Sequence, residues 1–219
     1  MPLSTGTLPR QLKIMFAGDS ICVGGTGTDT TNYGGWRLMT TVNLQTRLGR
    51  RLRLVGNNGG TNNGVMCGTS GLTVSEIDAT PYLIDQVPQY SPDVIFLHIG
   101  TNDCTQLNSG GSPTLATSRA NLTTLLNRIR TLAPNCVVFI CRIIDNSTAH
   151  TQVVNYNEAA IDIDVIARSD YASGLVKIVD MYTAVGLYSA TNYVDGSHPN
   201  GTGYALMVTK WQTDFNLYY

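Results

Sequence analysis

Short apolar runs alternate with longer amphipathic stretches along the chain. The run 93–99 (DVIFLHI) contains almost no polar position, which is typical of a strand buried on both faces. Four other short apolar runs are predicted strands: 12–17, 51–55, 136–144 and 175–179. Apolar residues recur at helical spacing over 35–50, 73–90, 113–132, 151–168 and 201–217. Ser112 and Pro113 are the predicted cap and first-turn residues of the third of these helices.

Strands separated by helices of this length predict parallel βαβ units with right-handed crossovers. We therefore expect one α/β domain over residues 1–219, a three-layer α/β/α sandwich around a mostly parallel sheet of about five strands. No repeat, linker or low-complexity stretch interrupts the chain, and 219 residues are enough for a full core. Ligands of such sheets bind at the carboxyl ends of the strands, so the residues directly after each strand are the first candidates for chemistry.

The composition narrows the classes of partner. Charged residues make up only 13% of the chain, the formal net charge is −1, and Lys and Arg do not cluster. Without a basic patch we expect neither a nucleic acid nor an anionic membrane as a partner. No apolar run approaches the roughly 20 residues of a membrane-spanning helix. The sequence contains no zinc-binding spacing, P-loop or complete dinucleotide motif, so we expect neither a metal nor a cofactor.

One serine and one histidine have the context of a nucleophile and its base. Ser20 follows the first predicted strand at a strand-to-loop corner, where its hydroxyl can stand clear of the sheet. Such a hydroxyl is a good nucleophile only when a base removes its proton. Of the three histidines, His198 has the best context, because the carboxylate of Asp195 can reach its ring. We predict Ser20, Asp195 and His198 as the catalytic residues of an acyl transfer.

Two further strand-end loops offer hydrogen-bond donors for a developing oxyanion. Gly71 ends the loop after the second predicted strand, and Asn102 follows the third strand in the segment 100–103 (GTND). The backbone N–H groups of Ser20 and Gly71 and the side-chain amide of Asn102 are predicted to converge on one oxygen. An amide suits this role because it donates hydrogen bonds without titrating.

These segments, with the GDS tripeptide at 18–20 and the DGSH segment at 195–198, resemble the consensus blocks of the SGNH, or GDSL-type, hydrolase superfamily. The match covers almost the whole chain, and each block lies in order at its own strand end. The resemblance implies an α/β/α fold. It also implies the triad and the oxyanion donors predicted above, which are Ser20, Asp195, His198, Gly71 and Asn102.

Finer features are similar to carbohydrate esterase family three, the acetylxylan esterases. They include 33–37 (YGGWR), 68–73 (GTSGLT) and 195–204 (DGSHPNGTGY). Thr69 and Leu72 stand where that family usually has His and Trp, which affects the contacts with the substrate. This resemblance implies a serine esterase that removes acetyl groups from an acetylated polysaccharide or oligosaccharide without a cofactor.

Two other functions remain open from the sequence. The first is a lipase, lysophospholipase or thioesterase of the same superfamily. The Gly/Asn-rich stretch 57–64 is too polar for a cleft that holds long acyl chains, which disfavours this alternative. The second is a carbohydrate-binding module with an inactive site, and the presence of Ser20, Asn102 and His198 argues against it.

We expect an extracellular, monomeric protein. Residues 1–10 lack the apolar region of a signal peptide, so either a leader has been removed or the protein is intracellular. A neutral polar composition gives weak support for export. So do three N-x-S/T sequons, at Asn121, Asn146 and Asn200.

Five other polar residues have a structural interpretation. Asp19 is expected to brace the loop that carries the nucleophile, and Asp103 to tether the loop after the third strand. His98 lies inside the most apolar strand, so we expect a core histidine with its hydrogen bonds satisfied. His150, in a polar loop, is expected at the solvated surface, and Arg37 is expected to have a structural role.

The five cysteines leave the disulfide pattern open. Cys22, Cys67 and Cys104 are expected around the rim of the predicted site, as small buried hydrophobic residues. The alternative hypothesis is one disulfide among them, with Cys67–Cys104 as the best pair, bracing two oxyanion loops. Cys136 and Cys141 bracket a strand about 16 Å long, beyond the ~7 Å limit between bridged Cα atoms, so they are not expected to pair.

Overall fold

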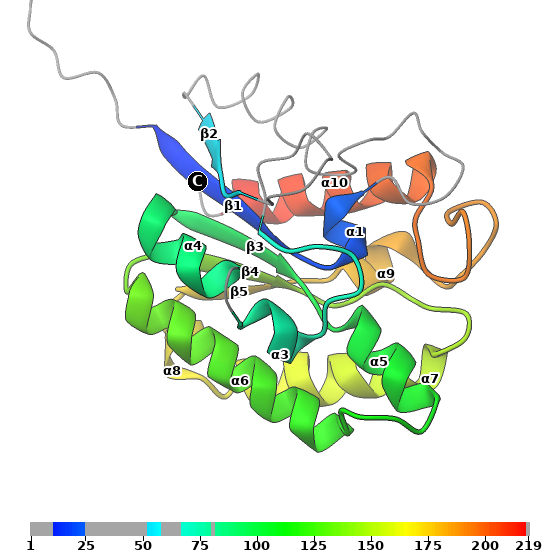
Figure 1. Ribbon diagram of the computed structural model, residues 1–219. Coiled ribbons are helices and arrows are strands. Elements are labelled where there is room, and N and C mark those ends of the chain that lie inside the picture. The colour runs from blue at the N-terminus through cyan, green and yellow to red at the C-terminus, as the bar shows by residue number, and fades with distance from the viewer. Residues whose placement is uncertain (1–10, 25–51, 58–66, 80–81, 218–219) are drawn as a thin grey trace, which may run out of the picture.

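The computed structural model describes residues 11–24, 52–57, 67–79 and 82–217. Five strands form one sheet with the order β2-β1-β3-β4-β5, and every neighbouring pair is parallel (Figure 1). The strands are β1 (Leu12–Gly18), β2 (Leu52–Val55), β3 (Val94–His98), β4 (Val137–Cys141) and β5 (Val176–Val179). The strand prediction is confirmed, with differences at the ends.

The largest difference is at the end of β4. The apolar pattern predicts a strand as far as residue 144, but β4 ends at Cys141. Beyond it, the Ile143 N–H donates to Asn157 Oδ1 (2.9 Å) instead of continuing the ladder to β5. The side chain of Asn157 thus replaces the neighbouring strand as the hydrogen-bond partner.

Helices cover both faces of the sheet, as the predicted three-layer sandwich requires (Figure 1). One face carries α3 (Val74–Ile77), α4 (Leu83–Tyr90), α5 (Thr101–Asn108), α6 (Leu115–Leu132) and α7 (His150–Tyr156). The other carries α1 (Ser20–Val23), α9 (Met181–Val185) and α10 (Gly201–Asn216). Alternation along β1 sends Met15 and Ala17 to the first face and Ile14 and Phe16 to the second.

An aromatic row forms the centre of the second layer. Phe16, Phe96 and Phe139 are in register on three adjacent strands, with ring centroids 5.4 and 4.8 Å apart. Trp211 of α10 meets the Phe96 ring edge-on at 4.3 Å, and Phe215 stacks on Trp211 at 4.9 Å. Such pairs contribute about 0.5–1.5 kcal/mol each beyond their buried area, so they hold α10 firmly against the sheet.

The helices differ from prediction at several places, and the short helices α1, α5 and α9 were not predicted. The predicted cap Ser112 is wrong: α6 begins at Leu115, and the Thr114 hydroxyl accepts from the Thr117 N–H as its cap. The predicted helix 151–168 is divided into α7 and a π-helix, η2 (Asn157–Val165). The predicted helix 73–90 is divided into α3 and α4. A short helix that was not predicted, α8 (Ser169–Ala172), precedes β5. The predicted helix 35–50 lies outside the described residues.

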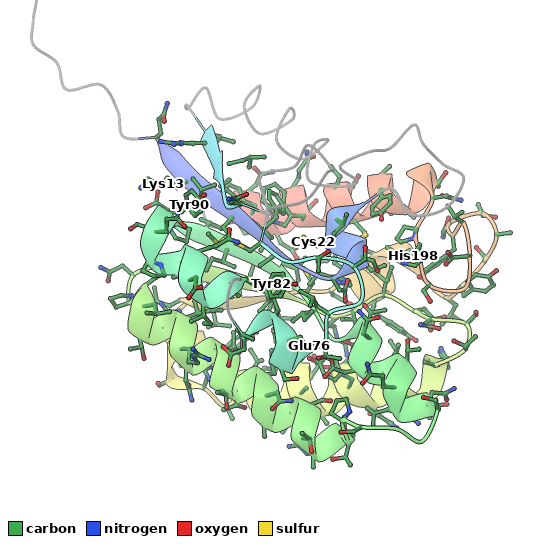
Figure 2. All side chains as sticks on the ribbon, viewed as in Figure 1. Lys13, Cys22, Glu76, Tyr82, Tyr90 and His198 are labelled. Atoms are coloured by element: carbon green, nitrogen blue, oxygen red, sulfur yellow. The ribbon has the colours of Figure 1, made fainter. Side chains whose placement is uncertain are left out.

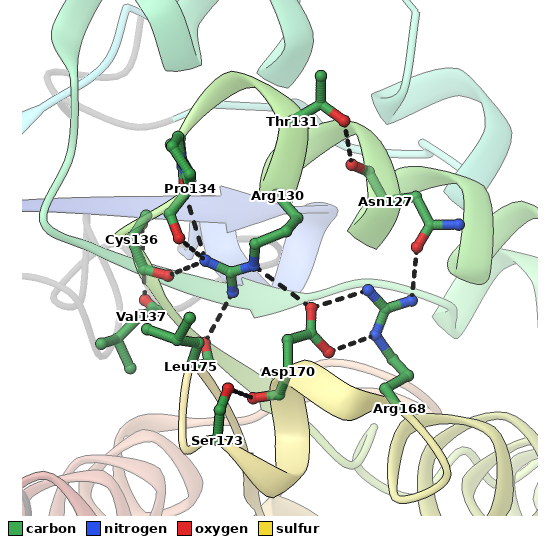
Figure 3. A network of polar contacts seen from close by, with 11 residues as sticks. Asn127, Arg130, Thr131, Pro134, Cys136, Val137, Arg168, Asp170, Ser173 and Leu175 are labelled. Atoms are coloured by element: carbon green, nitrogen blue, oxygen red, sulfur yellow. Dashed lines mark hydrogen bonds and ion pairs between the residues drawn. The ribbon is translucent and has the colours of Figure 1, made fainter.

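A partly buried arginine joins α6 to the two strands that follow it (Figure 3). The Arg130 guanidinium donates to the carbonyl oxygens of Pro134 (2.9 Å), Cys136 (2.8 Å) and Leu175 (3.0 Å). Its Nε faces Asp170, which Arg168 holds from the other side through two bonds of 2.8 Å. The planar fork of the guanidinium thus fixes the turns into β4 and β5.

None of the helices in the described segments is long and apolar enough to cross a membrane.

Candidate active site

Ser20 lies at the carboxyl edge of the sheet, as the first residue of α1 directly after β1. Asp19 caps this helix, because its carboxylate accepts from the Ile21 N–H (3.0 Å), which confirms the bracing role predicted for it. Gly18 has φ +156°, and a Cβ there would stand 2.1 Å from the carbonyl oxygen of His98. Only glycine lets β1 approach β3 this closely while turning into α1. Ser20 itself is 7% exposed.

The structure brings Ser20, His198 and Asp195 together. His198 Nε2 lies 2.9 Å from Ser20 Oγ, and Nδ1 lies 2.9 and 3.0 Å from the two carboxylate oxygens of Asp195. Figure 2 shows His198 beside α1, the helix that carries Ser20. The distances allow proton transfer from the hydroxyl to the imidazole, with a carboxylate behind the ring.

Asp195 is fixed by its own loop. Its Oδ1 accepts from the N–H groups of Ser197 (2.8 Å) and His198 (2.9 Å). Partial burial acts to raise the pKa of Asp195, but these bonds and the contact with the His198 ring outweigh it and hold the pKa below its usual value. The carboxylate therefore stays charged and can stabilise an imidazolium. The side chain is still 49% exposed, so solvent screens part of this interaction.

The predicted oxyanion donors lie on connected segments, with Gly71 in a loop and Asn102 in the first turn of α5 rather than in the predicted loop. The loop that contains Gly71 pairs with the end of β1, where the Gly18 N–H donates to the Cys67 carbonyl (3.0 Å). Asn102 Nδ2 donates to the carbonyl oxygen of Leu72 (2.9 Å), which joins α5 to the same loop. An amide nitrogen carries two hydrogens, so this bond leaves one for a ligand. Gly71 has φ +86° with open space at its Cβ position, so its backbone can face a ligand closely.

Asp103 supports the Gly71 loop and α5 from their buried side. It is fully buried, and its carboxylate accepts from the Val74 N–H (2.9 Å) and the Ser118 hydroxyl (3.0 Å). Burial raises the pKa of Asp103, while those two bonds oppose the shift. The predicted tethering role is confirmed: Asp103 connects α5 to α3 and α6, and so positions the neighbouring Asn102.

His98 differs from its prediction. It is a buried core residue, as expected, but neither ring nitrogen has a hydrogen-bond partner among the described residues. Its nearest charged neighbour is Asp19, with 4.0 Å between Nδ1 and Oδ1. Burial lowers the pKa of His98 to about 4 and raises the pKa of Asp19 to about 6. The imidazole is therefore neutral at physiological pH, because burial disfavours its charged form.

His150 is at the surface as predicted, but it is not simply solvated. Its Nδ1 lies 2.7 Å from Oδ1 of the buried Asp145. The other carboxylate oxygen of Asp145 accepts from the Tyr188 N–H (2.8 Å). Sequence alone missed this arrangement, because the burial of Asp145 depends on the packed fold and its second partner, Tyr188, lies 43 residues away.

The disulfide hypothesis is wrong. None of the five cysteines, all of which are described, forms a disulfide, and all are buried. The Cys67 thiol donates to Gln86 Oε1 (3.0 Å), and the Cys104 thiol to the Gln152 carbonyl (3.5 Å). Each thiol has its own acceptor on a different element, so the two do not face each other. Cys136 and Cys141 do not pair either, as predicted. Burial raises the pKa of four of these thiols, those of Cys67, Cys104, Cys136 and Cys141.

Other candidate sites are weaker. Within the described segments, no group of three or more His, Cys, Asp or Glu side chains could hold a metal ion. A hollow of about 300 Å³ lies at the opposite, amino edge of the sheet, between residues 91–93 and 132–136. Its lining contains none of the predicted site residues. Arg37 and the segment 33–37 lie outside the described residues.

Comparison with known proteins agrees with this geometry. The sequence model of the GDSL-like lipase/acylhydrolase family matches residues 16–206, from β1 into α10. The chain belongs to this family. The predicted resemblance to SGNH, or GDSL-type, hydrolases is thereby confirmed, and the chain is a member of a hydrolase family.

Individual relatives of this GDSL-family chain include carbohydrate esterases. A multidomain esterase of Ruminococcus flavefaciens is 29% identical over 91% of the chain, which spans only 28% of that protein's length. A carbohydrate esterase family 3 structure from Talaromyces cellulolyticus has a TM-score of 0.74 at 22% identity, covering 94% of this chain and 97% of that one. A family 3 carbohydrate esterase of Clostridium thermocellum has a TM-score of 0.74 at 24% identity, covering 95% and 97%. These structures share the fold of the GDSL-family chain.

Proposed function

We propose that this chain is a serine esterase that removes acetyl groups from an acetylated polysaccharide or oligosaccharide. The observation that carries the proposal is the 2.9 Å contact between His198 Nε2 and Ser20 Oγ, with Asp195 on the other ring nitrogen. Family membership supports ester hydrolysis as the reaction class. The similarity to carbohydrate esterases supports a sugar-bound acetyl ester as the substrate.

The reaction proceeds in two halves. His198 Nε2 takes the proton of Ser20 Oγ as that oxygen attacks the acetyl carbonyl carbon. The tetrahedral intermediate collapses, the bond between the carbonyl carbon and the sugar oxygen breaks, and the sugar oxygen takes the proton from His198. Water then attacks the acetylated Ser20 and gives a proton to His198. Acetate leaves as Ser20 Oγ recovers that proton.

Charge stabilisation comes from the groups around this pair. The N–H groups of Ser20 and Gly71 and the Asn102 amide donate to the oxyanion that forms in each half-reaction. Asp195 stabilises the His198 imidazolium, since its lowered pKa keeps it ionised at neutral pH. No step needs a group from outside the chain other than the ester and water.

The test is an ester panel run on the wild type and on Ser20→Ala. We expect turnover of p-nitrophenyl acetate to exceed that of the octanoate, together with release of acetate from acetylated xylan. Ser20→Ala should reduce kcat by about 10⁴-fold or more, because nucleophile and base act as a unit. Ser109→Ala is the matched control, since Ser109 is exposed at the end of α5 and bonds only within that turn.

The outcomes separate the alternatives. Equal activity of Ser20→Ala and wild type would refute the mechanism. Preference for octanoate would favour a lipase or thioesterase over a deacetylase. Turnover of neither ester, combined with binding to the polysaccharide, would indicate a carbohydrate-binding module with an inactive site.

A further inference from the structure

Asn146 is a buried amide that the proposed mechanism does not use. It lies in the loop after β4 and is 1% exposed. Its Nδ2 donates to the hydroxyls of Ser197 (3.0 Å) and Thr105 (3.3 Å), and its Oδ1 accepts from the N–H (3.0 Å) and hydroxyl (2.8 Å) of Thr148. An amide offers two donors and two acceptor positions, so all four are occupied.

The two acceptors of this amide belong to opposite halves of the site. Ser197 precedes His198, and its N–H donates to Asp195 Oδ1 (2.8 Å). Thr105 lies one turn after Asn102 on α5, where its hydroxyl donates to the Thr101 carbonyl (3.0 Å). One side chain therefore connects the loop of the general base to the helix of the oxyanion donor.

Backbone packing reinforces the same junction. The Ser147 N–H donates to the carbonyl oxygen of Gly196 (2.8 Å), and a Cβ on Gly196 would stand 2.6 Å from Ser147 Oγ. The loop 195–198 otherwise lies near solvent, with the His198 side chain 22% exposed. Its contact with the loop after β4 thus anchors a segment that is partly exposed.

We propose that Asn146 is a positioning residue that fixes His198 relative to the oxyanion donor Asn102. The inference rests on the proposed function, because it concerns the same site. Reaction requires the base, the nucleophile and the oxyanion donors to match the transition state at the same moment. A displacement of about 1 Å can cost on the order of 100-fold in rate. Asn146 prevents such a displacement, since its bonds reach both parts from one rigid, buried side chain.

This role also changes the interpretation of the sequence around Asn146. The segment 146–148 is an N-x-T sequon, but both N–H groups of the Asn146 amide are hydrogen-bonded in the core. The side-chain amide of Asn200 is likewise engaged, as the N-cap of α10. These two sequons therefore mark structural asparagines and add nothing to the case for export.

Asn157 provides a matched control. It is 2% exposed, and its amide makes two bonds of 2.9 Å to the N–H and carbonyl of Ile143. It thus resembles Asn146 in burial and in hydrogen-bond chemistry. No bond of the Asn157 amide that the structure records goes to the loop 195–198 or to α5. Replacing either residue by alanine removes a buried amide, but only one of them connects the predicted site.

The experiment compares Asn146→Ala with Asn157→Ala, using p-nitrophenyl acetate at a temperature where circular dichroism shows both folded. We expect Asn146→Ala to reduce kcat by about 10- to 100-fold with KM within about twofold of wild type. Asn157→Ala should lower Tm by a similar amount and leave kcat within about threefold. If Asn146 has only a structural role, Asn146→Ala and Asn157→Ala will reduce kcat equally, and that result would overturn the proposal.

A conservative variant separates position from stability. In Asn146→Asp the Ser197 hydroxyl can turn to donate, so the link to the base loop is kept, while a buried charge lowers Tm. We expect Asn146→Asp to retain more kcat than Asn146→Ala despite an equal or lower Tm. If kcat follows Tm across the three variants, Asn146 has no positioning role.

A variant in the loop 195–198 tests the same connection if the Asn146 variants do not fold. Ser197→Ala removes the acceptor in the base loop, and it should reduce kcat by about tenfold with Tm nearly unchanged. Unchanged kcat in Ser197→Ala would contradict the proposal. Failure of the proposed esterase function has a different signature, because the wild type itself would then not turn over the ester.

Discussion

Asn102 is a side chain whose contribution to turnover can be measured directly. Replacing it by alanine removes one predicted oxyanion donor, and we expect kcat to fall by about 100- to 1,000-fold with little change in KM. The bond to the Leu72 carbonyl is lost as well, so a Tm measurement must accompany the kinetics. Asn108→Ala, at the exposed end of the same helix, is the control. A loss of less than tenfold would remove Asn102 from the oxyanion site.

His98 makes the stability of the protein depend on pH. Its pKa is about 4 in the folded chain against the usual value of 6.5, because burial disfavours the charged ring. Between those two values the unfolded chain binds a proton that the folded chain does not, so this contribution to stability is lost as the pH falls from about 6.5 to about 4. Asp19, with its pKa raised to about 6, contributes in the opposite direction over a similar range.

The variant His98→Gln isolates the histidine contribution. Glutamine binds no proton, so the variant does not lose this contribution as the pH falls. The free energy of unfolding of His98→Gln minus that of wild type should therefore increase by about 2 kcal/mol from pH 7 to pH 4.5. Urea unfolding at the two pH values measures this difference, and Asp19 is common to both proteins. A constant difference between variant and wild type would mean that His98 is protonated in the folded state.

Among the secondary-structure elements, α6 packs on the core through Leu122, Leu125, Leu126 and Ile129, and Arg130 adds hydrogen bonds to the turns that follow it. Arg130→Lys keeps the charge but loses the fork that reaches three carbonyl oxygens. We expect the free energy of unfolding to fall by about 1–2 kcal/mol, because partly buried carbonyl groups lose their partners. Thermal or urea unfolding checks this.

Arg128→Lys is the matched control on the same helix. Arg128 is exposed and bonds only to Asp78, so its replacement should have a clearly smaller effect. Equal destabilisation by the two variants would show that the network around Arg130 contributes nothing specific.

Helix boundaries illustrate why local pattern predicts elements better than their ends. The apolar face of α6 is evident in the sequence, but its start depends on which hydroxyl meets a free N–H, and Thr114 does so in place of Ser112. The end of β4 likewise depends on Asn157, which reaches it from a segment 14 residues away. Both boundaries are set by side-chain contacts that periodicity does not encode.

For the molecule as a whole, the state of the thiols gives a simple test of the packing. All five cysteines are buried and outside any disulfide, so we expect almost no alkylation of the native protein. In denaturant without a reducing agent, intact mass should show five alkyl groups added. A mass with three or fewer added groups would restore the disulfide hypothesis and contradict the separate acceptors found for Cys67 and Cys104.

Much of the architecture could be predicted from the chain. The run of apolar residues in β3 identified a strand buried on both faces, and the alternation of strands and helices led to the parallel sheet. Ser20, Gly71, Asn102 and His198 were found because strand-end loops of a parallel sheet lie at one edge. The burial of His98, Cys22, Cys67 and Cys104 was predicted. The hydrogen bonds of Asn146, the thiol acceptors and the lack of partners for the His98 ring among the described residues could not be predicted, since each depends on neighbours distant in sequence.

The sequence alone therefore specifies the layers of this protein and the residues at the carboxyl edge of its sheet, because periodicity and side-chain chemistry are local properties. Tertiary structure decides how these residues meet. Ser20 and His198 are 178 residues apart, and their 2.9 Å contact exists only because α1 and the loop 195–198 pack at the same edge. Packing of separate loops also sets the protonation of His98 and the four bonds of Asn146, since burial and hydrogen-bond partners arise only when the chain is folded.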